Sequence, residues 1–357
     1  MTHHLTKIAL TDMQADLRDQ AMKFCADKGP ISKVRALLED ERGYDEATWS
    51  EMAELGWLGI AIPEVHGGLG LELADVVPIA EAMGKHLMNS PFASTTLAVQ
   101  AILSGGSDAQ KAAWLPKLAS GTVATVALFE PHGAWDLDEI NGDTKTFVLN
   151  LDAAEIVVTT VKRDGQARLA LIPRAAIEAR RETIIDETKR SYRFDMPDVT
   201  EDMLMPAELT SLALDRIELV ANLLQSAELS GAAMACVDYT VDYLKTRKQF
   251  DKTIGAFQAL KHPTVDAFVD AEGARSLLYA AATHCEKQGD GEIAVRMANA
   301  KAQDALAYAA DRSIQFHGGF GFTYDCDAQL YRRLAMFAAS QFGDAAFHRA
   351  RLAELLL

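Results

Sequence analysis

The sequence is poor in cysteine and in positive charge, and each shortage excludes a class of protein. Its 357 residues include four cysteines, far apart and without CxxC or zinc-ligand spacing, so neither a disulfide framework nor a metal site is expected. We expect reduced, mostly buried thiols in a cytoplasmic protein. The chain has 35 lysines and arginines against 51 acidic residues, a net charge of −16, which opposes binding to nucleic acid or to an anionic membrane surface.

Long apolar runs are also missing. No uninterrupted run reaches membrane-spanning length, and the first residues show no basic segment followed by an apolar core, so membrane insertion and secretion are not expected. The hydrophobic content of 49% with 24% charged residues is typical of a soluble globular protein. The length exceeds what one core usually serves, which predicts more than one subdomain.

Three regions with different hydrophobic periodicity follow one another. Residues 1–120 repeat apolar side chains at helical steps of three and four, whereas 121–206 contain short β-branched runs and a hairpin signal at Asp164-Gly165. Residues 207–357 predict four long helices, at 215–246, 258–284, 292–316 and 327–357. The sequence therefore predicts an α+β chain with an N-terminal helical domain, a small antiparallel β middle domain and a C-terminal four-helix bundle.

Two loops interrupt the helical patterns of the last region. One follows Arg247, and the other contains Gly318 and Gly319. Consecutive glycines let a ligand approach the backbone, and a guanidinium can bind a diphosphate through two hydrogen bonds. The loops suggest a nucleotide site, although Arg247 could simply be a helix-terminal cation and the glycines a helix end.

The residues of these loops resemble a known family. R-K-Q-F-x-K-x-I-G-x-F-Q from Arg247 and Q-x-H-G-G-x-G-F from Gln315 are similar to the C-terminal domain of the acyl-CoA dehydrogenases. These flavoenzymes introduce a double bond between Cα and Cβ of an acyl-CoA. The stretch P-E-V-H-G-G-L-G from Pro63 is similar to the signature of their first domain. The resemblance implies FAD as cofactor, an acyl-CoA substrate and an acceptor of the electron-transfer flavoprotein type.

The resemblance also implies a set of cofactor-binding residues. Arg247 would bind the FAD diphosphate, and Gln258 would contact the adenosine with Phe250 as the aromatic beside it. Gln315, with Gly318 and Gly319, matches the family's stretch that meets the FAD diphosphate of a neighbouring subunit.

The middle region departs from the family pattern. Phe129-Glu130-Pro131-His132-Gly133-Ala134 stands where the family has a T-E-P-x-x-G-S-D-like segment, with phenylalanine in place of the hydroxyl and no Ser-Asp. No K-x-W-I-T-like strand is recognised after it. Because these two segments flank the flavin ring in the family, we expect that wall to be missing.

The catalytic base is missing too. Removal of the α-proton requires a carboxylate, which the family places nine residues after the arginine of an L-x-R-D-like segment or on the first long helix. Counting from Arg332 gives Gln341, and the helical position is Ala221; neither can ionise. Asp344 is the one nearby carboxylate that we retain as a displaced base.

These losses favour one hypothesis over two alternatives. Some bacterial members of the family are two-gene α₂β₂ heterotetramers in which one subunit keeps the glutamate, often acting on steroid side-chain CoA thioesters. The chain is similar to the degenerate subunit, with a homologous catalytic subunit as partner. The alternatives are a self-sufficient homomeric enzyme that uses Asp344, and a non-enzymatic assembly scaffold that has lost flavin.

Overall fold

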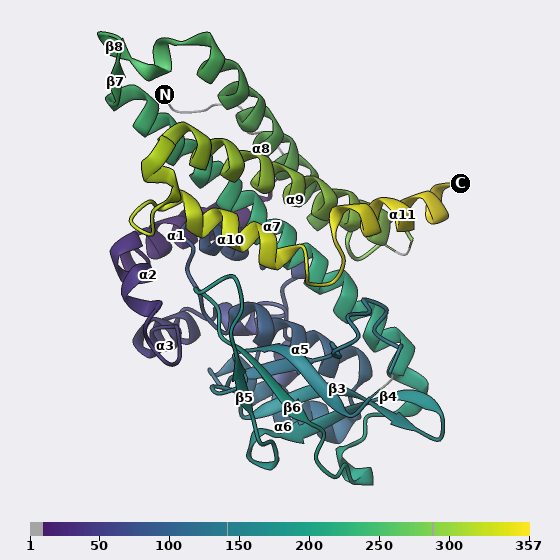
Figure 1. Ribbon diagram of the computed structural model, residues 1–357. Helices are drawn as coiled ribbons and strands as arrows, with labels where there is room; N and C mark the ends of the chain where they lie inside the picture. Colours follow the sequence, from purple (N-terminus) through teal and green to yellow (C-terminus); the bar gives the residue numbers. More distant parts are fainter. Residues whose placement is uncertain (1–9, 141, 288) are drawn as a thin grey trace. The chain divides into compact units, whose positions relative to one another are not determined.

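The chain divides into two compact units, each built from separate stretches of sequence. The computed structural model describes residues 10–140, 142–287 and 289–357 (Figure 1). Unit 1 holds the described part of Met1–Ser32 together with Val77–Met88 and Asn222–Leu357, and unit 2 holds Lys33–Val76 and Asn89–Ala221. The units cut across the three sequence domains, whose boundaries stay predictions.

Unit 1 is helical. Its helices are α1 (Asp12–Lys28), α4 (Val77–Lys85), α8 (Gln258–His284), α9 (Asp290–His317), α10 (Ala328–Ala338), α11 (Ala345–Leu356) and the part of α7 (Thr210–Thr246) from Asn222 onward. Two glycines let α4 and α7 approach closely, because a Cβ on Gly84 would lie 1.9 Å from the Glu228 carbonyl oxygen and one on Gly231 would lie 2.0 Å from that of Glu81. Helix α4 is therefore an integral part of this helical unit, although α8 to α11 lie far along the chain.

The predicted C-terminal helices are present, with one difference. Helix α8 has the expected bounds, and α7 and α9 begin and end within a few residues of theirs. The last predicted helix is two helices, because Phe342 and Gly343 have φ values of +54° and +102°, which a right-handed helix does not allow. The interruption falls at the segment where the family carries its glutamate.

Unit 2 combines helices with two small sheets. Its helices are α3 (Glu46–Glu54), α5 (Phe92–Gly105), α6 (Asp108–Ala119), most of α2 (Ile31–Leu37) and the start of α7. Its strands are β1 (Ala124–Ala127), β2 (Thr144–Leu149), β3 (Ile156–Arg163), β4 (Gln166–Pro173), β5 (Arg180–Glu182) and β6 (Ser191–Asp195). The sheets have the orders β1-β3-β4 and β2-β6-β5. The predicted hairpin at Asp164-Gly165 joins β3 to β4, but β1 pairs with β3 in parallel, so the middle region is not purely antiparallel.

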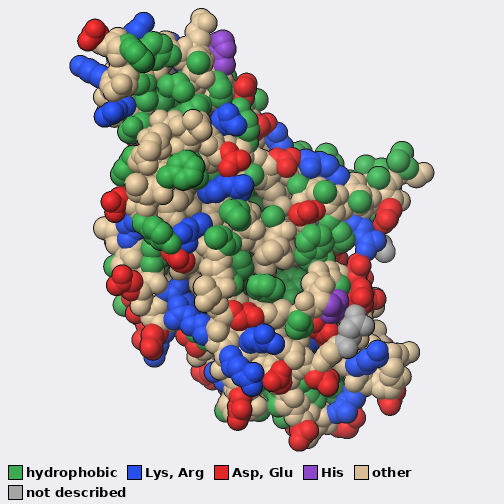
Figure 2. Space-filling view, in the orientation of Figure 1, with side chains coloured by type: hydrophobic (Ala, Val, Ile, Leu, Met, Phe, Trp, Pro, Cys, Tyr) green, Lys and Arg blue, Asp and Glu red, His purple; other side chains and the backbone are tan. Residues whose placement is uncertain are grey.

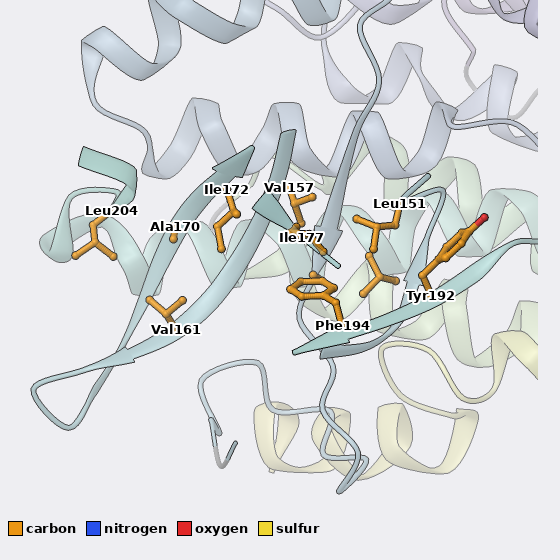
Figure 3. Close-up of a cluster of buried hydrophobic side chains, with 11 residues drawn as sticks. Leu151, Val157, Val161, Ala170, Ile172, Ile177, Tyr192, Phe194 and Leu204 are labelled. Carbon is orange, nitrogen blue, oxygen red and sulfur yellow. The ribbon is translucent and has the colours of Figure 1, made fainter. Parts of the chain in front are cut away.

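Side chains from both sheets form one buried cluster (Figure 3). Val157, Ala170 and Ile172 come from the β1-β3-β4 sheet, and Tyr192 and Phe194 come from β6. This cluster fixes the two sheets together, since buried apolar surface is the dominant favourable term in folding. All four cysteines are free and buried, as expected. Among the described residues, no helix is both long and apolar enough to span a membrane.

Candidate functional site

The loop after α7 is a tight hairpin with an exposed aromatic at its tip. Strands β7 (Lys248–Gln249) and β8 (Lys252–Thr253) are joined by Phe250 and Asp251. Both turn residues have positive φ, +54° and +62°, a geometry that normally selects Asn-Gly. Phe250 is 85% exposed. The backbone N–H of Ile254 donates to the Arg247 carbonyl oxygen at 2.8 Å, which closes the hairpin directly behind Arg247.

His317 connects the two loops that the sequence singled out. Its ring stacks on Tyr239 and Tyr243 of α7, with centroid distances of 4.8 and 4.1 Å. Nδ1 lies 2.7 Å from the carbonyl oxygen of Ser313, one turn earlier in α9, and the ring is 3% exposed. Because Arg247 follows Tyr243 by one helical turn, this stack brings the end of α7 and the glycines after α9 to the same end of unit 1 (Figure 1).

The residues at this end fit a nucleotide diphosphate. Gly318 has φ +62°, and a Cβ added at Gly318 or Gly319 would meet nothing within 4 Å, so the backbone is open to a ligand. Arg247, Gln258 and Gln315 are exposed, and their side chains make no hydrogen bond or ion pair within the described residues. Figure 2 shows basic and hydrophobic side chains together over the β7–β8 hairpin. These donors are available to an anion.

Strand β2 of unit 2 pairs with the segment Phe129-Glu130-Pro131 that the sequence singled out. Strand β2 reads K-T-F-V-L from Lys145, which shares with the family's K-x-W-I-T only the lysine and an aromatic residue at the third position. The Thr146 N–H donates to the Phe129 carbonyl oxygen at 3.0 Å, so the strand pairs with the F-E-P segment. The expectation that the flavin-flanking wall is missing stays a prediction. A β-bulge interrupts the register of β2 with β6 between Lys145 and Val148.

A buried ion pair holds these two segments together. The Lys145 ammonium donates to Glu130 Oε1 at 2.7 Å and to Thr160 Oγ1 at 2.9 Å, and Glu130 Oε2 accepts from the Gly142 N–H at 2.9 Å. Both side chains are almost completely buried. Burial lowers the pKa of Lys145, although the Glu130 carboxylate beside it acts in the opposite direction. Both charges have hydrogen-bond partners, as buried charges require.

Neutral amides surround the segment where the family has its base. The Gln225 amide donates to the Ala338 carbonyl oxygen at 3.0 Å, and the Gln303 amide donates to that of Gly343 at 2.9 Å. Asn299 links these two glutamines, accepting from Gln303 at 2.6 Å and donating to Gln225 at 2.9 Å. Gln341 lies within this turn and is 5% exposed. The turn is thus fixed by amide groups, and its central side chain cannot accept a proton as a carboxylate would.

The two other positions considered for a base are Ala221 and Asp344. Ala221 is buried in α7. Asp344 is the N-cap of α11, and its Oδ1 accepts a hydrogen bond from the Phe347 N–H at 2.7 Å. Capping accounts for an aspartate at this position without any catalytic role.

Comparisons with known proteins agree with this architecture. The model of the acyl-CoA dehydrogenase N-terminal domain matches residues 11–122, and that of the C-terminal domain matches residues 211–357. The acyl-CoA dehydrogenase IpdE2 of Mycolicibacterium smegmatis is 33% identical over 312 residues, which cover 87% of this chain and 88% of the relative. The relative of the same name from Mycobacterium tuberculosis is also 33% identical, over 321 residues.

Solved structures show the same fold. The Tcur3481–Tcur3483 steroid ACAD superposes with a TM-score of 0.85 at 27% identity, covering 96% of this chain and 97% of that one. The ChsE4–ChsE5 complex from Mycobacterium tuberculosis gives a TM-score of 0.88 at 22% identity, covering 98% and 99%. With both terminal domains matched and relatives similar over most of their length, the chain belongs to the acyl-CoA dehydrogenase family.

Proposed function

We propose that this chain is the non-catalytic subunit of a heteromeric acyl-CoA dehydrogenase. Family membership implies FAD as the cofactor. In our proposal, Arg247, Gln258 and the stretch from Gln315 to Gly319 bind the adenosine and diphosphate of FAD across an interface. A homologous partner subunit supplies the glutamate. The observation that carries the proposal is the contrast within unit 1 between an open nucleotide-binding end and an amide-filled turn at Gln341.

Exposed aromatic side chains support an interface at this end of unit 1. Phe250 and Phe322 are 85% and 87% exposed, and Tyr324 is 61% exposed. Large exposed apolar side chains beside polar ones mark interaction sites in soluble proteins. Phe250 lies in the β7–β8 hairpin after Arg247, and Phe322 and Tyr324 follow Gly318 and Gly319. One partner surface could therefore cover both loops.

The names of the relatives support a two-subunit assembly and a steroid-type substrate. One solved neighbour is the steroid ACAD Tcur3481–Tcur3483, whose name joins two chains, and another is the complex of ChsE4 with ChsE5. By analogy, we propose an acyl-CoA with a steroid-derived acyl group for the assembly that contains this chain, and an acceptor of the electron-transfer flavoprotein type.

The side chains of this chain suggest which steps it would support and which it would leave to the partner subunit. FAD, held by these residues and those of the partner, would supply the acceptor for the hydride that leaves Cβ of the acyl group. In this chain, Arg247 would orient the diphosphate with two parallel hydrogen bonds, and the open peptides of Gly318 and Gly319 would let the phosphate approach the backbone. The proton at Cα must go to a carboxylate of the partner, because neither Gln341 nor Ala221 can accept it.

The proposal is tested by flavin content and native mass. The full-length chain is expressed alone and with the product of the adjacent gene, and we expect a heterotetramer with about one FAD per pair of unlike chains only when both are present. Arg247→Ala in the co-expressed complex should weaken FAD binding about 10- to 100-fold. Lys245→Ala, an exposed cation in the last turn of α7, is the matched control and should leave it unchanged.

Two outcomes would overturn the proposal. A lone chain that carries a full complement of flavin and oxidises acyl-CoA would identify a self-sufficient enzyme; loss of that activity in Asp344→Asn would then identify its base. A complex that stays colourless with its partner would instead indicate an assembly scaffold.

A further inference from the structure

One buried imidazole of unit 1 stacks on two tyrosine rings. His317, the last residue of α9, lies nearly parallel to the rings of Tyr239 and Tyr243 of α7, with interplanar angles of 15° and 26°. About one turn earlier on each helix, Thr240 Oγ1 donates to Ser313 Oγ at 2.7 Å. Stacked ring pairs stabilise a contact beyond the apolar area that they bury, so the imidazole joins the end of α9 to α7.

The hydrogen bonds of His317 favour its neutral form. A carbonyl oxygen only accepts, so Nδ1 carries the proton that it donates to the Ser313 carbonyl oxygen, and Nε2 is an acceptor. Among the described residues, the buried Nε2 has no hydrogen-bond partner. Burial lowers the pKa of His317 below 6.5, although the Ser313 carbonyl and the Asp327 carboxylate act in the opposite direction. The titratable groups around the ring and its stack lie on α7 and before α10: Tyr239, Tyr243, Cys326 and Asp327.

A second histidine shows which of these contacts is unusual. His284 ends α8, and its Nδ1 also lies 2.7 Å from the carbonyl oxygen one turn earlier, that of Ala280. Such a bond satisfies a carbonyl at a helix C-terminus. His284 is half-buried and stacks on no aromatic ring of the described residues. Burial and stacking therefore distinguish His317, and helix capping does not account for them.

Backbone hydrogen bonds extend the contact from Tyr243 to Arg247. The Arg247 N–H donates to the Tyr243 carbonyl oxygen at 2.9 Å, and the Arg247 carbonyl oxygen accepts from the Ile254 N–H at 2.8 Å. Both backbone groups of Arg247 are thus fixed, and one of them is fixed to a residue that stacks on His317.

The chain turns sharply directly after His317. Gly318 has φ +62° and ψ −138°, a conformation that only glycine adopts readily. Gly321 then packs against α9, because a Cβ there would lie 2.2 Å from the Ile314 carbonyl oxygen. The loop between these glycines is therefore fixed to α9 at both ends, and its first anchor is the residue that stacks on α7.

We propose that His317 is a positioning residue that couples the Arg247 loop (residues 247–254) to the glycine loop (residues 318–322). The ring would hold the guanidinium and the open peptides at the separation that one diphosphate requires, and such preorganisation lowers the cost of binding. This inference rests on the proposed function and extends it, because it assigns an influence on nucleotide affinity to a residue that need not contact the nucleotide.

Hydrogen exchange of the full-length chain tests the coupling without any nucleotide. His317→Leu removes the stack, so the amides of Arg247 and Ile254 in one loop and of Gly318 and Thr323 in the other should exchange about tenfold faster. Exchange in the β3–β4 hairpin of unit 2 should not change. His317→Phe keeps a stacking ring and should show the wild-type rates in both loops. His284→Leu is the matched control and should alter neither loop.

FAD affinity of the co-expressed complex tests the positioning role. At about pH 8, His317→Leu should raise the Kd for FAD about tenfold, whereas His317→Phe should leave it unchanged. As the pH falls from about 8 to about 5, the wild type should lose affinity relative to His317→Phe, because protonation of His317 opposes its burial and phenylalanine does not titrate. This comparison does not require the leucine variant to be folded.

Each contradiction has its own reading. If His317→Leu accelerates exchange in only one loop, or if His317→Phe exchanges as fast as the leucine variant, the stack does not couple the loops. If both loops respond but FAD affinity is equal in all variants at each pH, His317 does not position the nucleotide site. A wild-type complex without FAD would refute the proposed function and the nucleotide role together, while hydrogen exchange would still decide whether His317 couples the two loops.

Discussion

The ion pair between Lys145 and Glu130 gives the sharpest stability prediction. Replacing Lys145 by methionine keeps most of the side-chain volume but removes the ammonium group that donates to Glu130 and Thr160. The Glu130 carboxylate would keep its hydrogen bond from the Gly142 N–H and would lose its opposite charge. Because that carboxylate is almost completely buried, water cannot replace the lost partner.

The expected cost follows from this burial. Breaking a buried ion pair from one side typically costs about 3–5 kcal/mol, whereas replacing both charges by neutral groups of similar volume is often nearly neutral. We therefore expect Lys145→Met to lower the free energy of unfolding by about 4 kcal/mol. The double variant Lys145→Met/Glu130→Gln should recover most of that loss, which corresponds to a coupling energy of about 2 kcal/mol or more.

Urea denaturation of the wild type, both single variants and the double variant measures this coupling. Circular dichroism and tryptophan fluorescence should report the same transitions, and an unchanged slope with denaturant would attribute the shifts to stability. If the double variant is as unstable as the sum of the single variants, the two groups do not stabilise each other. The ion pair would then have no part in holding β2 to the F-E-P segment.

Three further predictions concern unit 1. Burial, and then the neighbouring Arg296, lowers the pKa of His348 from 6.5 to about 4. The free energy of unfolding should therefore fall by about 3 kcal/mol as the pH drops from above 6.5 to below 4. Denaturation of His348→Gln at each pH should show a weaker dependence of stability on pH. Gly231→Ala should lower the melting temperature, at a cost of about 1–3 kcal/mol or more, because its Cβ would overlap a backbone carbonyl of α4. Gly273→Ala in α8 is the control and should leave the melting temperature unchanged, because the nearest atom there is the end of a flexible lysine at 3.4 Å. Gln341→Glu should unfold more readily at about pH 8 than at about pH 5, because it buries a carboxylate among neutral amides. The lone chain with this substitution should gain no acyl-CoA oxidation. A stable and active variant would contradict the conclusion that this turn cannot hold a base.

Much of the helical architecture could be predicted from the sequence, because helical periodicity is a local signal. Helix α8 begins at Gln258 as expected, directly after the 3₁₀ turn Ile254–Ala256. The pairing of β1 with β3 is parallel and depends on residues about thirty apart along the chain, which no local pattern encodes. The break between α10 and α11 was missed although Gly343 and the N-cap Asp344 mark it, because apolar residues at helical spacing resume on both sides; the backbone has positive φ at Phe342 and Gly343.

Part of the candidate site could likewise be predicted from local sequence motifs, and part of it could not. Motifs that consist of consecutive residues, such as those from Arg247 and Gln315, were recognised from the sequence, and the structure places them at one end of unit 1. The pairing of β2 with the F-E-P segment could not be predicted, because it joins residues that are separated in the sequence. His317 and the amides around Gln341 act through partners that are distant in sequence, so only the fold could identify them.

The three-part construction of unit 1 limits how this protein could be inherited in pieces. Helix α4 lies between two stretches of unit 2 in the sequence, yet its backbone fits against Gly231 of α7. A recombination event that transferred only residues 222–357 to another gene would leave behind the helix that Gly231 packs against. The transferred piece would expose a groove in place of a core. Exchange between members of such a family should therefore favour whole chains, and subunits that specialise should diverge by substitution within an intact scaffold.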